Sequence, residues 1–221
     1  MNEMVFKLQP DIVVNNRNEV GGDFSTPEQE IRAAKAGRAW ETCMTMNDSW
    51  GYQRADDNWK SSKTLIRNLV QCAEGGGNYL LNIGPKGDGS IPPESVERLT
   101  EVGKWMEKHG PTIYETERSQ VTDSVLAGFT RKGNTLYVQV YNWPGSTVAV
   151  GGIKTKVNSA QLVLTGRKMD VKQEGVRVQI AGLPEQAPEE PITSIALECE
   201  QEPVQDIEWV FKALLRRGVG V

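Results

Sequence analysis

The spacing of apolar residues changes once along this chain, near residue 119. Before that point, short apolar runs alternate with amphipathic segments. Three runs predict strands, over residues 11–15, 40–46 and 79–83, and the first of them has the β-branched composition of a strand buried on both faces. One helix is predicted from Ser61 or Ser62 to the glycines at 75–77, and a second from Pro92 to His109. This alternation of strands and helices predicts parallel βα units.

After residue 119 the apolar residues mostly alternate with polar ones, and glycine-containing turns separate the runs. The predicted strands cover residues 126–131, 135–141, 147–150, 160–164, 176–180 and 194–197. This pattern is typical of a small antiparallel β-sandwich. In the tail, Ile207, Val210, Phe211, Leu214 and Leu215 have the spacing of one helix face. The sequence therefore predicts an α/β domain over 1–118, an all-β domain over 119–201 and a tail over 202–221 that can form a helix.

Composition excludes several kinds of partner. A formal net charge of −4 leaves no basic excess, so we expect no nucleic-acid partner. No apolar run approaches the roughly 18 residues that a membrane-spanning helix needs, so we expect no membrane partner either. Residues 1–4 have neither a basic nor an apolar signal region. We therefore expect no signal peptide in this chain, and its compartment stays open.

The histidine and cysteine residues limit which kinds of catalytic and metal site this chain can form. The single histidine, His109, is expected to be an exposed cation that caps its helix rather than a catalytic base. Cys43, Cys72 and Cys199 are expected to be buried reduced thiols. Clusters of metal-ligating residues are absent, and the glycine-rich segment 84–90 lacks the order of a phosphate-binding loop. We therefore expect neither a metal nor another cofactor.

Carboxylates, an arginine and aromatic residues gather in the loops that follow the first two predicted strands. They are Arg17, Asp23 and Glu28 in the first loop, and Asp48, Trp50, Tyr52, Asp56, Asp57 and Trp59 in the second. The loops after parallel strands share one edge of the sheet, where catalytic groups collect in barrel enzymes. Carboxylates beside tryptophans suit sugars, because indole rings stack on apolar C–H groups while carboxylates bind hydroxyls or move protons.

Several segments, in order and over about half of the chain, resemble glycoside hydrolase family 29, the retaining α-L-fucosidases. The matching stretches are residues 10–17, 22–28, 40–45, 49–52, 60–62, 76–85, 87–91, 102–105 and 113–116. The resemblance implies the last part of a TIM-like (β/α)8 barrel, with the N-terminal half of the barrel absent, followed by the family's C-terminal β-sandwich. Full-length relatives would be bacterial proteins, either cytoplasmic or periplasmic and secreted.

The resemblance also implies roles for individual residues. Glu28 falls at the position of the general acid/base, and Arg17 at that of an arginine that contacts substrate. Trp50 aligns with an aromatic residue that packs on the fucose ring. Tyr52 and Trp59 are candidates for the rim of the pocket. The implied activity is exo-hydrolysis of terminal α-L-fucose from a fucosylated oligosaccharide or glycoconjugate, with transfucosylation left open.

The family's nucleophile is an aspartate upstream of the segment that matches residues 11–17, so we expect this chain to lack it. If the chain is active alone, another carboxylate must replace that aspartate, with Asp23 and Asp48 as candidates, and a homo-oligomer would cover the open edge of the barrel. Two alternatives remain: a non-catalytic carbohydrate-binding or interaction protein, and an incomplete reading frame without independent function.

Overall fold

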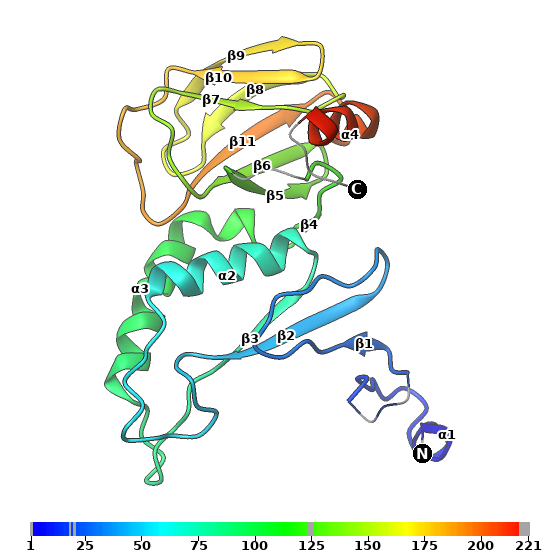
Figure 1. Cartoon of the computed structure of the whole chain (residues 1–221), viewed down its shortest axis with the longest axis vertical. Coiled ribbons are helices and arrows are strands. Elements are labelled where there is room, and N and C mark those ends of the chain that lie inside the picture. Colours follow the sequence, from blue (N-terminus) through cyan, green and yellow to red (C-terminus); the bar gives the residue numbers. More distant parts are fainter. Residues whose placement is uncertain (1, 18, 20, 123–125, 217–221) are drawn as a thin grey trace. The chain divides into compact units, whose positions relative to one another are not determined.

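A computed structural model describes residues 2–17, 19, 21–122 and 126–216 (Figure 1). The chain divides into two compact units, Met1–Leu99 and Thr100–Val221. The division falls within helix α3 (Pro93–His109), which contributes residues to both units. The predicted domain boundary after residue 118 lies further along the chain and stays a prediction.

The first unit contains a parallel three-stranded sheet, in the order β1 (Phe24–Ser25), β2 (Ala39–Thr45) and β3 (Asn78–Asn82). Helix α2 (Ser62–Glu74) connects β2 to β3, so the predicted βα succession is confirmed for this part of the chain. The hydroxyl oxygen of Ser61 accepts a bond from the backbone N–H of Thr64 at 3.2 Å and caps α2. A short helix, α1 (Asn2–Leu8), and the two-residue β1 were not predicted.

Helix α2 covers one face of this sheet. Trp40, Thr42 and Met44 of β2 are buried, and Asn68 of α2 donates hydrogen bonds to the sulfur of Met44 and the hydroxyl of Tyr79. Cys43, between them in β2, is only half-buried, and its register partner Leu80 in β3 is 52% exposed. Side chains alternate between the two faces of a strand. Among the described residues, the face that carries Cys43 and Leu80 is therefore open.

The strand predicted over residues 11–15 is wrong. Only Asn15 makes a bridge, with Phe24, and Val13 is 68% exposed. The β-branched composition fits a strand buried on both faces, but the described residues place neither a covering layer nor a second neighbouring strand against this segment. Propensity alone does not form a strand without such contacts.

The second unit contains an antiparallel sheet that folds over itself (Figure 1). Its hydrogen-bonded order is β4-β5-β6-β11-β8-β9-β10-β7. The strands are β4 (Glu117–Arg118), β5 (Ala127–Lys132), β6 (Thr135–Val140), β7 (Thr147–Val150), β8 (Val157–Leu162), β9 (Lys168–Glu174), β10 (Arg177–Ala181) and β11 (Thr193–Cys199). A short 3-10 helix, η1 (Gly110–Thr112), precedes them.

Strand β9 joins the two layers of the folded sheet. Its first residues, Lys168 and Met169, pair with β8, whereas residues 170–174 pair with β10. Residues from both layers, among them Phe129, Leu197 and Ile180, share one buried core. A barrel-type α/β part followed by an antiparallel sandwich confirms the predicted fold class.

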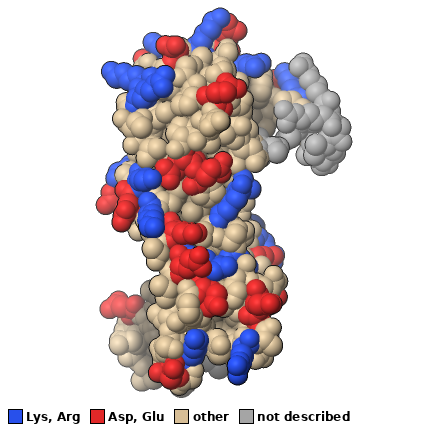
Figure 2. Space-filling view, turned by 90° about the vertical axis from the view of Figure 1, so that its left-hand side faces the viewer, with Lys and Arg blue, Asp and Glu red and all other residues tan. Residues whose placement is uncertain are grey.

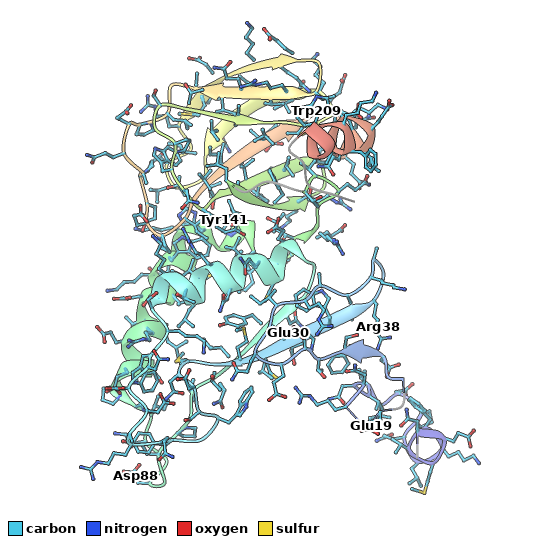
Figure 3. The ribbon with its side chains drawn as sticks, in the orientation of Figure 1. Glu19, Glu30, Arg38, Asp88, Tyr141 and Trp209 are labelled. Carbon is cyan, nitrogen blue, oxygen red and sulfur yellow. The ribbon has the colours of Figure 1, made fainter. Side chains whose placement is uncertain are left out.

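The tail forms a helix, as predicted. Helix α4 (Ile207–Arg216) follows a segment in which Gln205 pairs with Ile153 and the N–H of Asp206 donates to the carbonyl of Gly152 at 2.8 Å. Trp209, labelled in Figure 3, lies over Gly151, where an added Cβ would be 2.4 Å from the indole ring. The predicted face members Leu214 and Leu215 have side chains outside the described part of the structure.

His109 contradicts its prediction as an exposed cation. The side chain is fully buried at the end of α3, where its ring stacks on Trp105 with the centroids 4.8 Å apart. Burial lowers the pKa of His109 to about 4, so the ring is neutral at physiological pH. The i,i+4 spacing places Trp105 beside His109 on the predicted helix, but the sequence does not show the sandwich strand that encloses the ring.

All three cysteines are free thiols, and Cys72 and Cys199 are buried as predicted.

Figure 2 shows basic and acidic side chains interspersed on the face in view, without a continuous basic stripe. None of the described helices is long and apolar enough to span a membrane.

Candidate functional site

Arg17 and Glu28 form an ion pair beside the parallel sheet of the first unit. The Nη1 atom of Arg17 lies 2.5 Å from Oε2 of Glu28, and both side chains are a little over 40% exposed. The hydrogen bond to this carboxylate is the first cause of the raised pKa of Arg17. The structure therefore brings together two residues that the sequence placed in one loop 11 positions apart.

The backbone of β2 fixes the segment that carries Glu28. The N–H of Cys43 donates to the carbonyl of Pro27 at 3.1 Å, and the N–H of Gln29 donates to the carbonyl of Cys43 at 2.9 Å. These bonds form a parallel bridge between Glu28 and Cys43 beyond the end of β1. The pairing of the chain with β2 thus extends past β1 to Glu28. This places Glu28 toward the carboxyl edge of the sheet, where catalytic side chains gather in parallel barrels.

All three guanidinium nitrogens of Arg17 are hydrogen-bonded to side chains. Besides Nη1 to Glu28, Nε donates to the hydroxyl of Thr26 at 3.1 Å and Nη2 lies 2.9 Å from the sulfur of Cys43. Asn16 in turn accepts from both the backbone N–H and the hydroxyl of Thr26. The sequence predicted only a buried thiol at Cys43, and the position of Cys43 beside Arg17 was missed. Side chains alternate between the two faces of a strand, so the three-residue separation of Trp40 and Cys43 could have shown that they lie on opposite faces.

Gln29 follows Glu28 with a φ of 55°, in the left-handed region that non-glycine residues seldom adopt. Its side chain is bonded to the end of β2, because Nε2 donates to the hydroxyl of Thr45 at 2.9 Å and Oε1 accepts from the N–H of Thr45 at 3.3 Å. The conformation next to Glu28 is thus held by contacts to a neighbouring strand.

The loop after β2 carries Asp48 and is stabilised by hydrogen bonds within itself. Asp48 accepts from the amide of Asn58 at 2.9 Å, and Asp56 accepts from the backbone N–H of Asp48 at 3.1 Å. The side-chain bond from Ser49 is the first cause of the lowered pKa of Asp56. Lys60 ends the loop, donating to the carbonyls of Thr45 at 2.8 Å and Asn47 at 3.0 Å.

The aromatic candidates occupy different positions in this loop. Trp50 is 42% exposed, and its backbone carbonyl accepts a bond from the amide of Asn82 at 2.6 Å. Tyr52 is 43% exposed with the ammonium of Lys86 5.5 Å from its ring centroid. The guanidinium of Arg98 lies 5.6 Å from the ring centroid of the half-buried Trp59. Trp50 and Tyr52 therefore have ring surface to offer a ligand, whereas Trp59 also anchors the loop to α3.

Asp23 has a structural contact that the sequence did not indicate. Its carboxylate accepts from the backbone N–H of Val14 at 2.8 Å, and its own N–H donates to the carbonyl of Val14 at 2.6 Å. The site residues thus fall into two groups, Arg17 with Glu28 and the loop from Asp48 to Trp59, and the hydrogen bonds of the described residues do not connect them. Within the described ranges, no three His, Cys, Asp or Glu side chains gather as a metal site.

Comparisons with known proteins agree with this picture. A sequence model described as alpha-L-fucosidase matches residues 1–111. Human tissue alpha-L-fucosidase is 29% identical over 197 residues, which cover 81% of this chain and 42% of that protein. The structure of alpha-L-fucosidase isoenzyme 1 from Paenibacillus thiaminolyticus superposes with a TM-score of 0.81 at 30% identity, covering 90% of this chain and 52% of the other.

A Thermotoga maritima alpha-fucosidase in complex with a mechanism-based inhibitor superposes with a TM-score of 0.75 at 29% identity, covering 88% of this chain and 47% of that one. The chain spans about half the length, or less, of these relatives. The match over residues 1–111 includes the sheet, the Arg17–Glu28 pair and the loop after β2. This chain belongs to the alpha-L-fucosidase family.

Proposed function

We propose that this chain carries the proton-transfer side of a retaining α-L-fucosidase site, with Glu28 as the general acid/base. The Arg17–Glu28 pair is the observation that carries the proposal. It lies at the carboxyl edge of the parallel sheet, on the open face, and within the segment that matches the family. The substrate class is a fucosylated oligosaccharide or glycoconjugate with a terminal α-L-fucose.

Glu28 acts twice in such a mechanism. In the first step the acid form of Glu28, reached when the paired carboxylate takes up a proton, passes that proton to the glycosidic oxygen while a second carboxylate attacks C1 and the C1–O bond breaks. In the second step the carboxylate of Glu28 takes a proton from water, which attacks C1, displaces the enzyme carboxylate and releases fucose with its configuration retained. A carboxyl group that is about 40% exposed is accessible for both transfers.

Arg17 and Trp50 supply recognition. Arg17 has five N–H groups and uses three in its bonds to Thr26, Glu28 and Cys43, which leaves two donors for sugar hydroxyls. The exposed ring of Trp50 offers an apolar surface to the ring C–H groups and the methyl group of a 6-deoxy sugar. Tyr52 extends this surface toward Lys86 at the rim.

The attacking carboxylate must lie about 5 Å from the acid/base in a retaining enzyme. Asp23 is bonded to the backbone of Val14, so moving it would leave that N–H without its acceptor. Asp48 is exposed and bonded through one oxygen to Asn58, which makes it the better candidate for a replacement nucleophile. Asp48→Asn in the 221-residue protein tests this part: unchanged release of fucose removes Asp48 from consideration.

The test of Glu28 uses the full chain and aryl α-L-fucosides that differ in leaving-group acidity. We expect Glu28→Gln to lower kcat/KM by about 10²- to 10⁴-fold for poor leaving groups, and far less for an activated aryl fucoside that needs no protonation. Azide should restore turnover of the activated substrate by Glu28→Ala and yield the α-fucosyl azide, because azide needs no general base.

Glu30→Gln is the matched control, since Glu30 is an exposed carboxylate two positions away that pairs with Arg32. Equal rates for Glu28→Gln and the wild type, or a loss that does not depend on the leaving group, would overturn the acid/base assignment. A wild-type chain that releases no nitrophenol would overturn the proposed activity.

One observation favours a second candidate, a non-catalytic carbohydrate-binding protein. Among the described residues, the hydrogen bonds and ion pairs around Glu28 and Arg17 include no second carboxylate. Calorimetric binding of L-fucose, weakened in Trp50→Ala and accompanied by no turnover, would select this function over hydrolysis.

A further inference from the structure

Cys43 contacts both members of the Arg17–Glu28 pair. Its backbone N–H and carbonyl bond to Pro27 and Gln29, the residues on either side of Glu28. Its sulfur lies 2.9 Å from Nη2 of Arg17. Cys43 therefore fixes the backbone that carries the Glu28 carboxylate, and its sulfur also contacts one nitrogen of the Arg17 guanidinium.

The three acceptors around Arg17 differ in what they contribute. Thr26 and Glu28 both belong to the segment that follows β1, so they move with it. Cys43 alone belongs to the strand at the centre of the sheet. Bonds to Nε, Nη1 and Nη2 together restrict the planar guanidinium more than any two of them would.

We propose that the thiol of Cys43 is a positioning residue of the candidate site: it holds the guanidinium of Arg17 so that Arg17 keeps the Glu28 carboxylate in the orientation for proton transfer. The expected effect on the reaction rate rests on the proposed function. The contact between Cys43 and Arg17 does not depend on that function. Small misplacements of catalytic groups cost large factors in rate, because the reacting atoms must start close and aligned.

The test compares Cys43→Ala, which removes the acceptor, with Cys43→Ser, which retains a smaller one. The first readout is the exchange rate of the Arg17 Nε–H proton by ¹H–¹⁵N NMR, with its signal assigned by its absence in Arg17→Met. We expect exchange about tenfold faster in Cys43→Ala, because loss of an acceptor lets the guanidinium move, and a rate close to that of the wild type in Cys43→Ser.

The second readout is the division of the effect between kcat and KM. We expect Cys43→Ala to lower kcat by about tenfold with KM changed less than twofold, and Cys43→Ser to restore most of kcat. Cys72→Ala is the matched control, because Cys72 is a fully buried thiol of α2 in the same unit. It should lower the melting temperature and leave kcat unchanged.

Unchanged Arg17 exchange in Cys43→Ala would overturn the inference, as would equal losses in the alanine and serine variants. A wild-type kcat in Cys43→Ala, with the chain active, would overturn the positioning role and leave the proposed function intact. If the wild type shows no turnover, the proposed function fails, and the NMR comparison alone still decides whether the thiol holds the guanidinium.

Discussion

The Nδ1 atom of His109 lies 2.9 Å from the hydroxyl oxygen of Ser194, inside the second unit. The Ser194 hydroxyl donates its proton to the side-chain carbonyl of Gln139 at 2.6 Å, so it accepts from His109. This fixes the neutral tautomer with the proton on Nδ1. Nε2 is buried and has no hydrogen-bond partner among the described residues, which means that protonation would create an unpaired buried N–H.

The first prediction is that His109 makes the fold sensitive to acid. Its pKa is lowered to about 4 in the folded protein from an ordinary value of 6.5. Between these values the unfolded chain binds more protons than the folded one, so the free energy of unfolding falls as pH decreases. We expect a loss of about 3 kcal/mol from pH 7 to pH 4 from this residue.

Urea unfolding across this pH range, in the wild type and in His109→Gln, measures the effect. The variant lacks the titrating group, so the difference between the two curves isolates His109 from the carboxylates. If the free energy of unfolding changed with pH equally in the wild type and in His109→Gln, His109 would not bind its proton more readily in the unfolded chain.

The second prediction concerns the left-handed residue after Glu28. We expect Gln29→Ala to be about 1 kcal/mol less stable than Gln29→Gly, because both lose the bonds to Thr45 but only alanine retains the strain of a positive φ. The same two substitutions at the exposed Glu30 are the control, where alanine should be the more stable. Urea unfolding ranks the four variants, and alanine above glycine at position 29 would contradict the argument.

The third prediction is that Lys60 fixes the loop that carries Asp48 and Trp50. Its ammonium bonds to two carbonyls, and partial burial is the first cause of its lowered pKa. Lys60→Met leaves both carbonyls without this donor, at a cost of about 1–3 kcal/mol. Hydrogen exchange of residues 46–60 should become faster, and it should stay unchanged in Lys35→Met, an exposed lysine of the same unit.

The fourth prediction tests the packing beneath the parallel sheet. A Cβ at Gly77 would lie 2.1 Å from the ring of Trp40, which is 3% exposed and donates its indole N–H to the carbonyl of Gly75. We expect Gly77→Ala to destabilise the fold by about 1–3 kcal/mol, because the ring must move. In Gly87→Ala the added methyl meets no atom of the described residues within 4 Å, so thermal unfolding should change little there.

Helices and strands were predicted well where the local spacing of apolar residues defines them. The strand at 39–45, helices α2 and α3, and six strands of the sandwich follow from apolar spacing and from Ser, Pro and Gly at their ends. Strand β9 was missed because only Met169 and Val171 are apolar in its sequence, Lys-Met-Asp-Val-Lys-Gln-Glu, which therefore reads as polar. The strand predicted over residues 11–15 failed because burial depends on neighbours that composition cannot supply.

The candidate site shows the same division. Motifs made Glu28, Arg17 and Trp50 candidates, and the pairing of Arg17 with Glu28 agrees with their shared loop. The contacts of Cys43 and Lys60, and the structural use of Asp23, arise from segments that meet only after the strands pair. Sequence spacing carries no information on such contacts, just as it could not show that Ser194 meets His109.

The open face of the three-stranded sheet determines how strongly its charges interact. Water reaches the Arg17–Glu28 pair from this face, and a pair that is about 40% exposed contributes at most about 1 kcal/mol. The same two charges at the same separation would attract several times more strongly behind a layer that excludes water, because the effective dielectric constant would fall. A ligand that covered this face and excluded water would therefore strengthen the attraction between Arg17 and Glu28.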